Sequence, residues 1–276
     1  MSAAKQAPAE QARRLRAAKD PYNVSTIERA FDVLRTFSLR HPELSLMEIA
    51  QAAGLHKATA FRLLTALANR NMVIKNPRTG LYRLGFQVIE LAEIAKISTG
   101  LVSQARPFMR QIRDQLNETV YIAVRTGDNR VSLEQVEGLR DLRRVVAVGM
   151  LTPLYVGSTS LVMLASMPDE EIAAYFDRTE LVPPFPGAKV DRQTLWRNIA
   201  AIRTNGFAET HNKRLDEGAS VSAPLRGPGG DVIGALTVTI PIGRYTSEVR
   251  SAAITAIKAA GLAVSRELGA PSRGQS

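Results

Sequence analysis

The sequence contains no cysteine and only three histidines among its 276 residues. Without cysteine, the chain cannot form disulfides, thiolate zinc sites or a cysteine nucleophile. His41, His56 and His211 are far apart along the chain, so we expect no metal site. Nucleophile elbows and phosphate-binding loops are missing as well. These absences argue against an enzyme and against a bound cofactor.

Acidic residues are scarce relative to basic ones, and the formal net charge is +10. Residues 1–100 carry 15 Lys and Arg against 8 Asp and Glu, a net charge of +7, whereas residues 101–276 carry 21 against 18, a net charge of +3. A basic excess in the first third of a chain indicates a polyanionic partner such as nucleic acid. Charge alone leaves a generally basic, soluble protein as the alternative.

Long apolar runs of the kind that cross membranes are missing too. The N-terminus lacks the apolar core of a secretory signal. The uncharged stretch from Val145 to Pro168 is interrupted by Gly149, Pro153 and Gly157. A spanning helix needs a more continuous apolar segment, so this stretch predicts buried strand, turn and helix. We therefore expect a cytoplasmic protein with no membrane partner.

The length of the chain favours more than one domain, because a single core seldom organises this many residues. We expect a mobile basic arm at 1–22, a winged helix-turn-helix at 23–85, a linker helix at 86–100, a second domain at 101–268 and a tail at 269–276. In the second domain the strand and helix patterns alternate irregularly, which is typical of an antiparallel α+β fold. Strands are expected at 119–125, 130–136, 142–148, 207–210, 220–225 and 232–240, and helices at 101–116, 158–166, 169–176, 192–204 and 247–267.

Three helices and a hairpin are predicted between Ser25 and Leu84. Two Ser-x-x-Glu segments, at 25–28 and 45–48, have the spacing of capping boxes that open helices. A third helix is expected at 57–69, followed by short strands at 73–75 and 81–84 around a turn-forming loop. This order of elements is that of a winged helix-turn-helix.

The connection between the second and third helices carries a small residue and a glycine. Ala50 lets the two helices approach closely, and Gly54 tolerates the positive φ that the turn requires. An ordinary helical hairpin in a protein core has the same spacing. The basic hairpin that follows favours the DNA-binding interpretation.

The third helix has one apolar face and one polar face. On the polar face an arginine can bond a guanine edge or a phosphate, a threonine can bond a phosphate, and an alanine can contact a thymine methyl group. For the phenylalanine, packing within the protein is the alternative, and for each arginine a solvated surface charge is the alternative. The predicted DNA contacts are Lys57, Ala58, Thr59, Phe61, Arg62 and Thr65 on the helix, and Arg78 and Arg83 on the wing.

Three segments of this N-terminal region resemble IclR-type transcriptional regulators. They are STIERAFDVL at 25–34, LMEIAQAAGLHKATAFRLL at 46–64 and TGLYRLG at 79–85. Residues 153–160, 206–208, 220–224 and 231–238 resemble the same family less closely. The resemblance covers about residues 23–268.

The resemblance implies that 101–268 is a GAF-like, antiparallel-sheet domain that binds a small effector and oligomerises. It also implies a homodimer, or a dimer of dimers, on palindromic double-stranded operator DNA. By position in the family, the effector contacts are Leu154, Ser158, Thr159, Thr210, Ser220, Thr237 and Thr239. Two departures from the family pattern are a serine at 220, where cysteine is common, and a loop at 212–219 that is one residue short. The shorter loop leaves the register at Thr210 and Glu217 open.

The residues themselves support an effector site less strongly than the resemblance does. Strand hydroxyls near Arg143, Arg144 or Arg203 suit a small organic or aromatic acid. Thr237 and Thr239 can equally be residues that simply favour β-structure. The hydroxyls therefore predict an acid-binding site without excluding a purely structural role.

The function predicted from these features is sequence-specific DNA binding controlled by a small molecule, with repression or activation as the outcome. One alternative is an enzyme with a GAF-like catalytic domain using His211, Asp216 and Glu217. Another is an architectural DNA-binding protein without a pocket. The operator sequence, the effector and the choice between dimer and tetramer do not follow from the sequence.

Overall fold

The computed structural model of the chain describes residues 24–38, 40–183, 190–212 and 218–271. These residues form two compact units that divide between Ala95 and Lys96. The predicted arm at 1–22 and most of the predicted tail lie outside the described residues. Each unit is built around its own core, so the two are considered separately.

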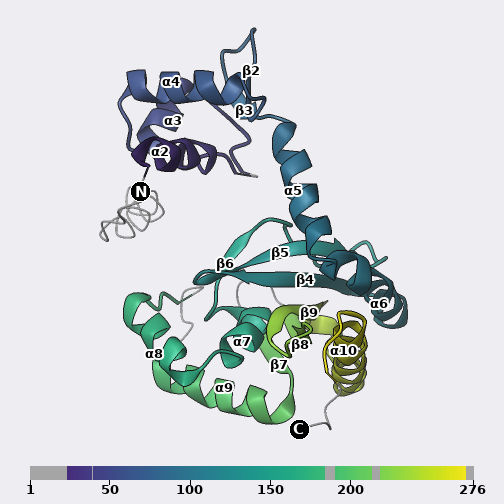
Figure 1. The fold of residues 1–276 in the computed structure, drawn as a ribbon. Coiled ribbons are helices and arrows are strands. Elements are labelled where there is room, and N and C mark those ends of the chain that lie inside the picture. The colour runs from purple at the N-terminus through teal and green to yellow at the C-terminus, as the bar shows by residue number, and fades with distance from the viewer. Residues whose placement is uncertain (1–23, 39, 184–189, 213–217, 272–276) are drawn as a thin grey trace. The chain divides into compact units, whose positions relative to one another are not determined.

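Among its described residues up to Leu84, the N-terminal unit contains three helices and a small antiparallel sheet (Figure 1). The helices are α2 (Ser25–Leu34), α3 (Leu46–Ala52) and α4 (Lys57–Ala68). The strands β1 (Glu43–Leu44), β2 (Val73–Lys75) and β3 (Tyr82–Leu84) lie in the order β1-β3-β2. The predicted winged helix-turn-helix is confirmed, with β1 as an additional strand that the pattern did not predict.

The two predicted capping boxes have different outcomes. At α3, Glu48 donates its backbone N–H to Ser45 Oγ at 3.3 Å, and Glu48 Oε2 accepts the Ser45 N–H at 2.8 Å. At α2 the prediction is wrong, because Val24 occupies the N-cap and makes no side-chain cap. Ser25 is already the first helical residue, and the Ile27 and Glu28 amides bond to the Val24 carbonyl instead.

The C-terminal unit is built on a six-stranded antiparallel sheet in the order β6-β5-β4-β9-β8-β7. On one face lie α6 and α10, and on the other lie α7, α8 and α9 (Figure 1). This arrangement confirms the predicted α+β class. The strands are β4 (Thr119–Thr126), β5 (Asn129–Val136), β6 (Leu151–Pro153), β7 (Ala208–Asn212), β8 (Gly218–Arg226) and β9 (Val232–Pro241), and the helices are α6 (Leu101–Leu116), α7 (Gly157–Ala165), α8 (Asp169–Arg178), α9 (Arg192–Asn205) and α10 (Ser247–Glu267).

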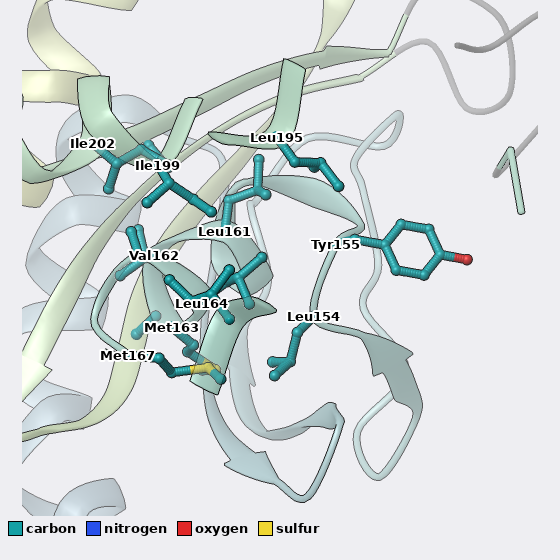
Figure 2. Close-up of a cluster of buried hydrophobic side chains, with 14 of the residues drawn as sticks. Leu154, Tyr155, Leu161, Val162, Met163, Leu164, Met167, Leu195, Ile199 and Ile202 are labelled. Atoms are coloured by element: carbon teal, nitrogen blue, oxygen red, sulfur yellow. The ribbon is translucent and has the colours of Figure 1, made fainter. Parts of the chain in front are cut away.

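Alternation along β4 separates two cores. Val120 and Ile122 pack with α6 and α10, whereas Tyr121 and Ala123 belong to the core beneath α7, α8 and α9. Figure 2 shows part of the second core, in which α7 contributes aliphatic side chains and Leu154 is fully buried. The sheet is thus covered on both faces, and its residues alternate between two buried layers.

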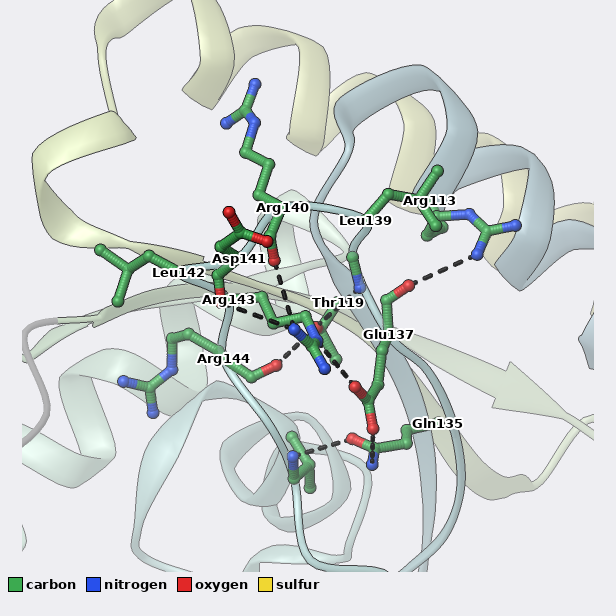
Figure 3. Close-up of polar contacts among 12 residues, drawn as sticks. Arg113, Thr119, Gln135, Glu137, Leu139, Arg140, Asp141, Leu142, Arg143 and Arg144 are labelled. Atoms are coloured by element: carbon green, nitrogen blue, oxygen red, sulfur yellow. Dashed lines mark hydrogen bonds and ion pairs between the residues drawn. The ribbon is translucent and has the colours of Figure 1, made fainter.

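One predicted strand, 142–148, is wrong. This segment is irregular, and the short edge strand β6 begins only at Leu151. Side chains satisfy its backbone groups: Thr119 Oγ1 donates to the Arg144 carbonyl, and Val146 N–H donates to Gln135 Oε1 at 2.8 Å (Figure 3). Because those backbone groups are already bonded, the segment does not need a strand ladder.

One helix, α5 (Gln87–Ser98), extends across the division between the units, in place of the linker helix expected at 86–100. None of its residues is buried. Among the described residues, no helix has both the length and the apolar character needed to cross a bilayer.

Candidate DNA interface and effector site

The polar face of α4 is open to solvent, as the pattern predicted. Its inward residues Ala60, Leu63 and Leu64 are buried in the core of the unit. The outward residues Lys57, Ala58, Phe61, Arg62 and Thr65 are exposed, and Thr59 is partly buried. A helix with a buried apolar face and an exposed basic and hydroxyl-bearing face can enter a major groove.

Phe61 and Thr65 are both accessible on this face. The Phe61 side chain is 49 % exposed, so packing inside the protein does not account for it. Thr65 Oγ1 donates to the Phe61 carbonyl at 2.9 Å, which uses its proton within the helix. Thr65 can therefore serve DNA as an acceptor or through its methyl group.

The wing is a tight loop between β2 and β3. Asn76 Oδ1 accepts the amide of Arg78 at 2.9 Å, and Gly80 closes the turn with a φ of +72°. Arg78 is exposed at this loop. Arg83 is partly buried, and its guanidinium lies over the Phe86 ring at 5.3 Å from the centroid. Arg78 is the wing arginine more open to a phosphate.

Two rows of hydroxyl groups cross the sheet of the C-terminal unit on the face covered by α7. In the first row, Tyr121 pairs with Thr237, which pairs with Ser222. The second row has one hydroxyl-bearing residue on each of four neighbouring strands: Thr119, Thr239, Ser220 and Thr210. Within this row, Thr210 on β7 pairs with Ser220 on β8.

Hydrogen bonds connect the first row to the start of α7. Tyr121 Oη and Thr159 Oγ1 are 2.6 Å apart, Thr159 and Thr237 are 2.9 Å apart, and Thr237 and Ser222 are 2.8 Å apart. Ser222 Oγ continues to Ser158 Oγ at 2.8 Å. All five side chains are buried. This chain of hydrogen bonds holds α7 against the sheet, and it leaves the first row of hydroxyl groups buried beneath the helix.

The second row is more accessible at one end. Ser220 Oγ donates to Thr239 Oγ1 at 3.2 Å, and Thr210 Oγ1 accepts the Ser158 N–H at 3.2 Å. Ser220 and Thr210 are only partly buried, unlike the first row. Of the predicted effector residues, Thr210 and Ser220 are partly buried, whereas the others are buried: Leu154, Ser158, Thr159, Thr237 and Thr239.

The prediction missed three residues of this arrangement, Thr119, Tyr121 and Ser222. Ser220-Val221-Ser222 and Thr237-Val238-Thr239 alternate hydroxyl and apolar side chains. This period of two places Ser222 on the same face as Ser220. The alternation was the available signal for Ser222, whereas the positions of Thr119 and Tyr121 depend on the pairing of β4 with β9.

Two arginines considered as acid-binding groups are engaged elsewhere. Arg203 donates to the carbonyls of Ala165 and Met167 at 2.9 and 2.8 Å and pairs with Asp169 at 2.7 Å. It therefore stabilises the C-terminal end of α7. Arg143 pairs with Glu137 at 2.7 Å (Figure 3).

Of the three titratable residues considered for catalysis, only His211 lies among the described residues. Asp216 and Glu217 lie outside them, and His211 Nε2 is 2.5 Å from Glu209 Oε1. Glu209 also accepts hydrogen bonds from Arg250 and from Tyr245 Oη. Burial alone would raise the pKa of Glu209, but the hydrogen bonds from Arg250, His211 and Tyr245 outweigh burial and lower the pKa to about 2.

This low pKa predicts a pH-dependent contribution of Glu209 to stability. A depressed pKa stabilises the folded state above the unfolded pKa and is lost as the pH falls through the folded pKa. At pH 7, Glu209→Gln should lower the free energy of unfolding by about 2 kcal/mol, allowing for solvent screening of Arg250. The difference should shrink between about pH 4.5 and about pH 2.

Urea unfolding followed by the fluorescence of Trp196 measures this difference at each pH. Glu170→Gln, at an exposed carboxylate on α8, is the matched control and should leave the stability within about 0.5 kcal/mol at every pH. A Glu209→Gln penalty that stays constant down to pH 2 would show that packing, not charge, is what the substitution removes.

Comparison with known proteins covers both units. The family described as "IclR helix-turn-helix domain" matches residues 26–77, and "Bacterial transcriptional regulator IclR C-terminal" matches residues 95–266. The chain belongs to the IclR family. It is therefore a DNA-binding transcriptional regulator with an effector-binding C-terminal domain, and not an enzyme.

Individual relatives agree with this assignment along most of their length. The HTH-type transcriptional regulator KipR of Bacillus subtilis is 26 % identical over 244 residues, which are 88 % of this chain and 97 % of KipR. A putative IclR transcriptional regulator from Silicibacter sp. TM1040 superimposes with a TM-score of 0.79 at 25 % identity, covering 90 % of this chain and 98 % of that one. An IclR homologue from Microbacterium hydrocarbonoxydans, crystallised with 4-hydroxybenzoate, has the same fold, with a TM-score of 0.76 at 21 % identity over 88 % and 98 % of the two chains.

Proposed function

We propose that this IclR-family protein binds a specific operator through α4 and the wing, and that a small organic acid bound on the second hydroxyl row changes its affinity for DNA. The observation that carries the DNA-binding half is the exposed face of α4 around Arg62, set on a buried apolar face. The predicted DNA contacts on this surface remain those at Lys57, Ala58, Thr59, Phe61, Arg62, Thr65, Arg78 and Arg83. Such a regulator acts in the cytoplasm, where the DNA is.

The effector half of the proposal rests on the second row of hydroxyls. Thr210, Ser220 and Thr239 present polar groups on an otherwise apolar sheet face, and two of them are partly open. The predicted residues Leu154, Ser158, Thr159 and Thr237 would form the floor and support beneath the ligand. The 4-hydroxybenzoate in the Microbacterium homologue supports an aromatic or other organic acid as the class to test first.

We further propose that the protein is a dimer that reads two half-sites, with a dimer of dimers as the larger assembly. Ile27 and Phe31, one turn apart on α2, are each 55 % exposed. Ile89, Ile94 and Ile97 on α5 are also exposed. Apolar helix faces of this kind are typical of surfaces that a second copy covers.

The proposal is tested by fluorescence anisotropy with promoter DNA from beside the gene, with and without organic acids. Specific binding should be saturable and salt-sensitive, and much tighter than binding to a scrambled duplex of the same composition. A carboxylate effector should shift the affinity for the operator and not that for the scrambled duplex. Equal affinity for both duplexes would contradict a sequence-specific regulator.

Arg62→Ala should weaken operator binding about 10- to 100-fold, because one base-edge or phosphate contact is worth about 1–3 kcal/mol. The thermal midpoint should change little, since the Arg62 side chain is exposed. Arg35→Ala, at the exposed end of α2, is the matched control and should keep wild-type affinity. Parallel loss of stability and binding in Arg62→Ala would instead assign Arg62 a structural role.

A further inference from the structure

We infer that Arg78 and Thr79, at the tip of the wing loop, bind one phosphate of the DNA backbone together, and that Asn76 positions both of them. The wing loop is residues 76–81, which join β2 to β3 (Figure 1). This inference rests on the proposed DNA contact of Arg78. It adds a hydroxyl contact at Thr79, which the sequence pattern did not predict, and a positioning role for Asn76.

Asn76 bonds to the backbone of the wing loop in four places. Its side-chain Oδ1 accepts the amides of Arg78 and Thr79 at 2.9 and 3.4 Å. Its carbonyl accepts the Gly80 amide and its own amide donates to the Leu81 carbonyl, each at 2.8 Å. An asparagine that bonds the amide two residues ahead forms an Asx turn, which fixes the loop before DNA arrives. The amides at the tip are used within the loop, so contact with DNA is left to the side chains.

The guanidinium of Arg78 is the basic group of the wing that is most open to DNA. Arg78 is exposed, and its side chain makes no hydrogen bond or ion pair with any other described residue. Lys75, in contrast, places its ammonium 5.5 Å from the centroid of the Tyr82 ring, and Arg83 lies over the Phe86 ring. Arg78 therefore loses no internal contact on binding, and its planar guanidinium matches the oxygens of a phosphate.

The hydroxyl proton of Thr79 is also available to a ligand. Thr79 is exposed, and its Oγ1 accepts the Leu81 amide at 3.3 Å, which orients the hydroxyl but uses only a lone pair. Thr65 on α4 differs, because its hydroxyl donates to the Phe61 carbonyl at 2.9 Å. The oxygens of a DNA phosphate accept hydrogen bonds and need a donor. Thr79 supplies such a donor, whereas Thr65 would have to break its bond within the helix.

Both side chains start from adjacent positions at an exposed loop tip. The Cα atoms of Arg78 and Thr79 are about 3.8 Å apart, so their side chains can reach oxygens of the same phosphate. Contacts to the backbone position a protein on the duplex and carry no sequence information. The wing should therefore strengthen binding to any duplex by the same factor, while Arg62 and its neighbours on α4 distinguish the bases.

The experiment measures fluorescence anisotropy of the full-length protein with promoter DNA from beside the gene and with a scrambled duplex, between about 50 and 200 mM salt. Arg78→Ala should weaken both duplexes about tenfold and lower the salt slope by about one for each wing that contacts DNA. Thr79→Val should weaken both about three- to tenfold with the slope unchanged, because it removes a donor and no charge. Thr79→Ser keeps the hydroxyl and should bind within about twofold of wild type.

A double-mutant cycle tests the positioning role of Asn76. Asn76→Ala should weaken both duplexes about three- to tenfold, because the loop must then be ordered as DNA binds. In a protein that already carries Arg78→Ala and Thr79→Val, the same change should cost less than about twofold, because no contact remains to be positioned. Asn76→Ser, whose hydroxyl can accept the same amides, should recover most of the affinity. Asn198→Ala, at an exposed asparagine on α9, is the matched control and should bind DNA as wild type does.

Three results would overturn parts of this inference and leave the proposed operator binding through α4 in place. Thr79→Val binding as tightly as wild type would remove the hydroxyl contact. An Asn76→Ala penalty that is equal in both backgrounds would make Asn76 merely structural. Variants at Arg78 and Thr79 that weaken the promoter duplex alone would show that the wing reads bases and does not bind a phosphate.

Failure of the proposed function gives a different result. If wild type binds both duplexes equally and the wing variants weaken both as expected, sequence specificity fails and the phosphate contact stands. Unchanged binding by Arg78→Ala would overturn the phosphate contact together with the proposed role of the wing. Circular dichroism and the thermal midpoint identify any variant that fails to fold, and the serine variants at 76 and 79 then carry the test.

Discussion

Replacing Ile27 and Phe31 together by aspartate is expected to make the protein monomeric and to lower its affinity for the operator about 100-fold or more. When two half-sites are read by one dimer, the second contact is intramolecular, and its loss costs about two to four orders of magnitude in affinity. Each residue is 55 % exposed on α2, on the side opposite the buried Val33. The substitutions therefore add charge to a surface that is already open in the single chain.

Size-exclusion chromatography with light scattering gives the mass, and anisotropy gives the affinity for the full operator and for a single half-site. The variant should bind both duplexes with nearly the same, weak affinity. Leu262→Asp on α10, which is also an exposed apolar position at 53 %, is the matched control and should stay dimeric. A variant at Ile27 and Phe31 that keeps both the dimer mass and the wild-type affinity would contradict α2 as the dimer surface.

The DNA-binding unit was predictable because its signals are local. The period of α4, the Ser45–Glu48 cap and the glycine in the turn at 54 each act within a few residues of sequence. The error at Ser25 has the same origin. The two Ser-x-x-Glu segments have the same sequence pattern, but Ser25 lies inside its helix. Only Ser45 is an N-cap residue, whose side chain can accept a hydrogen bond from a free backbone amide.

The effector unit was predictable as a list of elements and much less as a site. Composition and alternation predicted β4, β5, β7, β8 and β9 but not β6, and the order β4-β9-β8 is a long-range property. That order places Thr119, Arg144 and Gly218 together although they are distant along the chain. The irregular segment at 142–148 looks like a strand in sequence because its apolar residues favour β-structure, while side chains of β4 and β5 take its backbone hydrogen bonds.

The segment that carries Arg144 is anchored by a buried ion pair, and removing one partner gives the second large prediction. Glu118 is 1 % exposed and accepts two hydrogen bonds from Arg244, at 2.5 and 2.8 Å. Arg244 Nη2 also donates to the Leu142 carbonyl at 3.1 Å. Arg244→Met should lower the free energy of unfolding by about 3 kcal/mol, because a buried carboxylate loses its main counter-charge.

A double-mutant cycle distinguishes charge from packing. Glu118→Met combined with Arg244→Met should regain much of the stability lost in Arg244→Met, since no uncompensated charge then remains buried. Arg140→Met, at the more exposed partner of the same carboxylate, should cost at most about 1 kcal/mol.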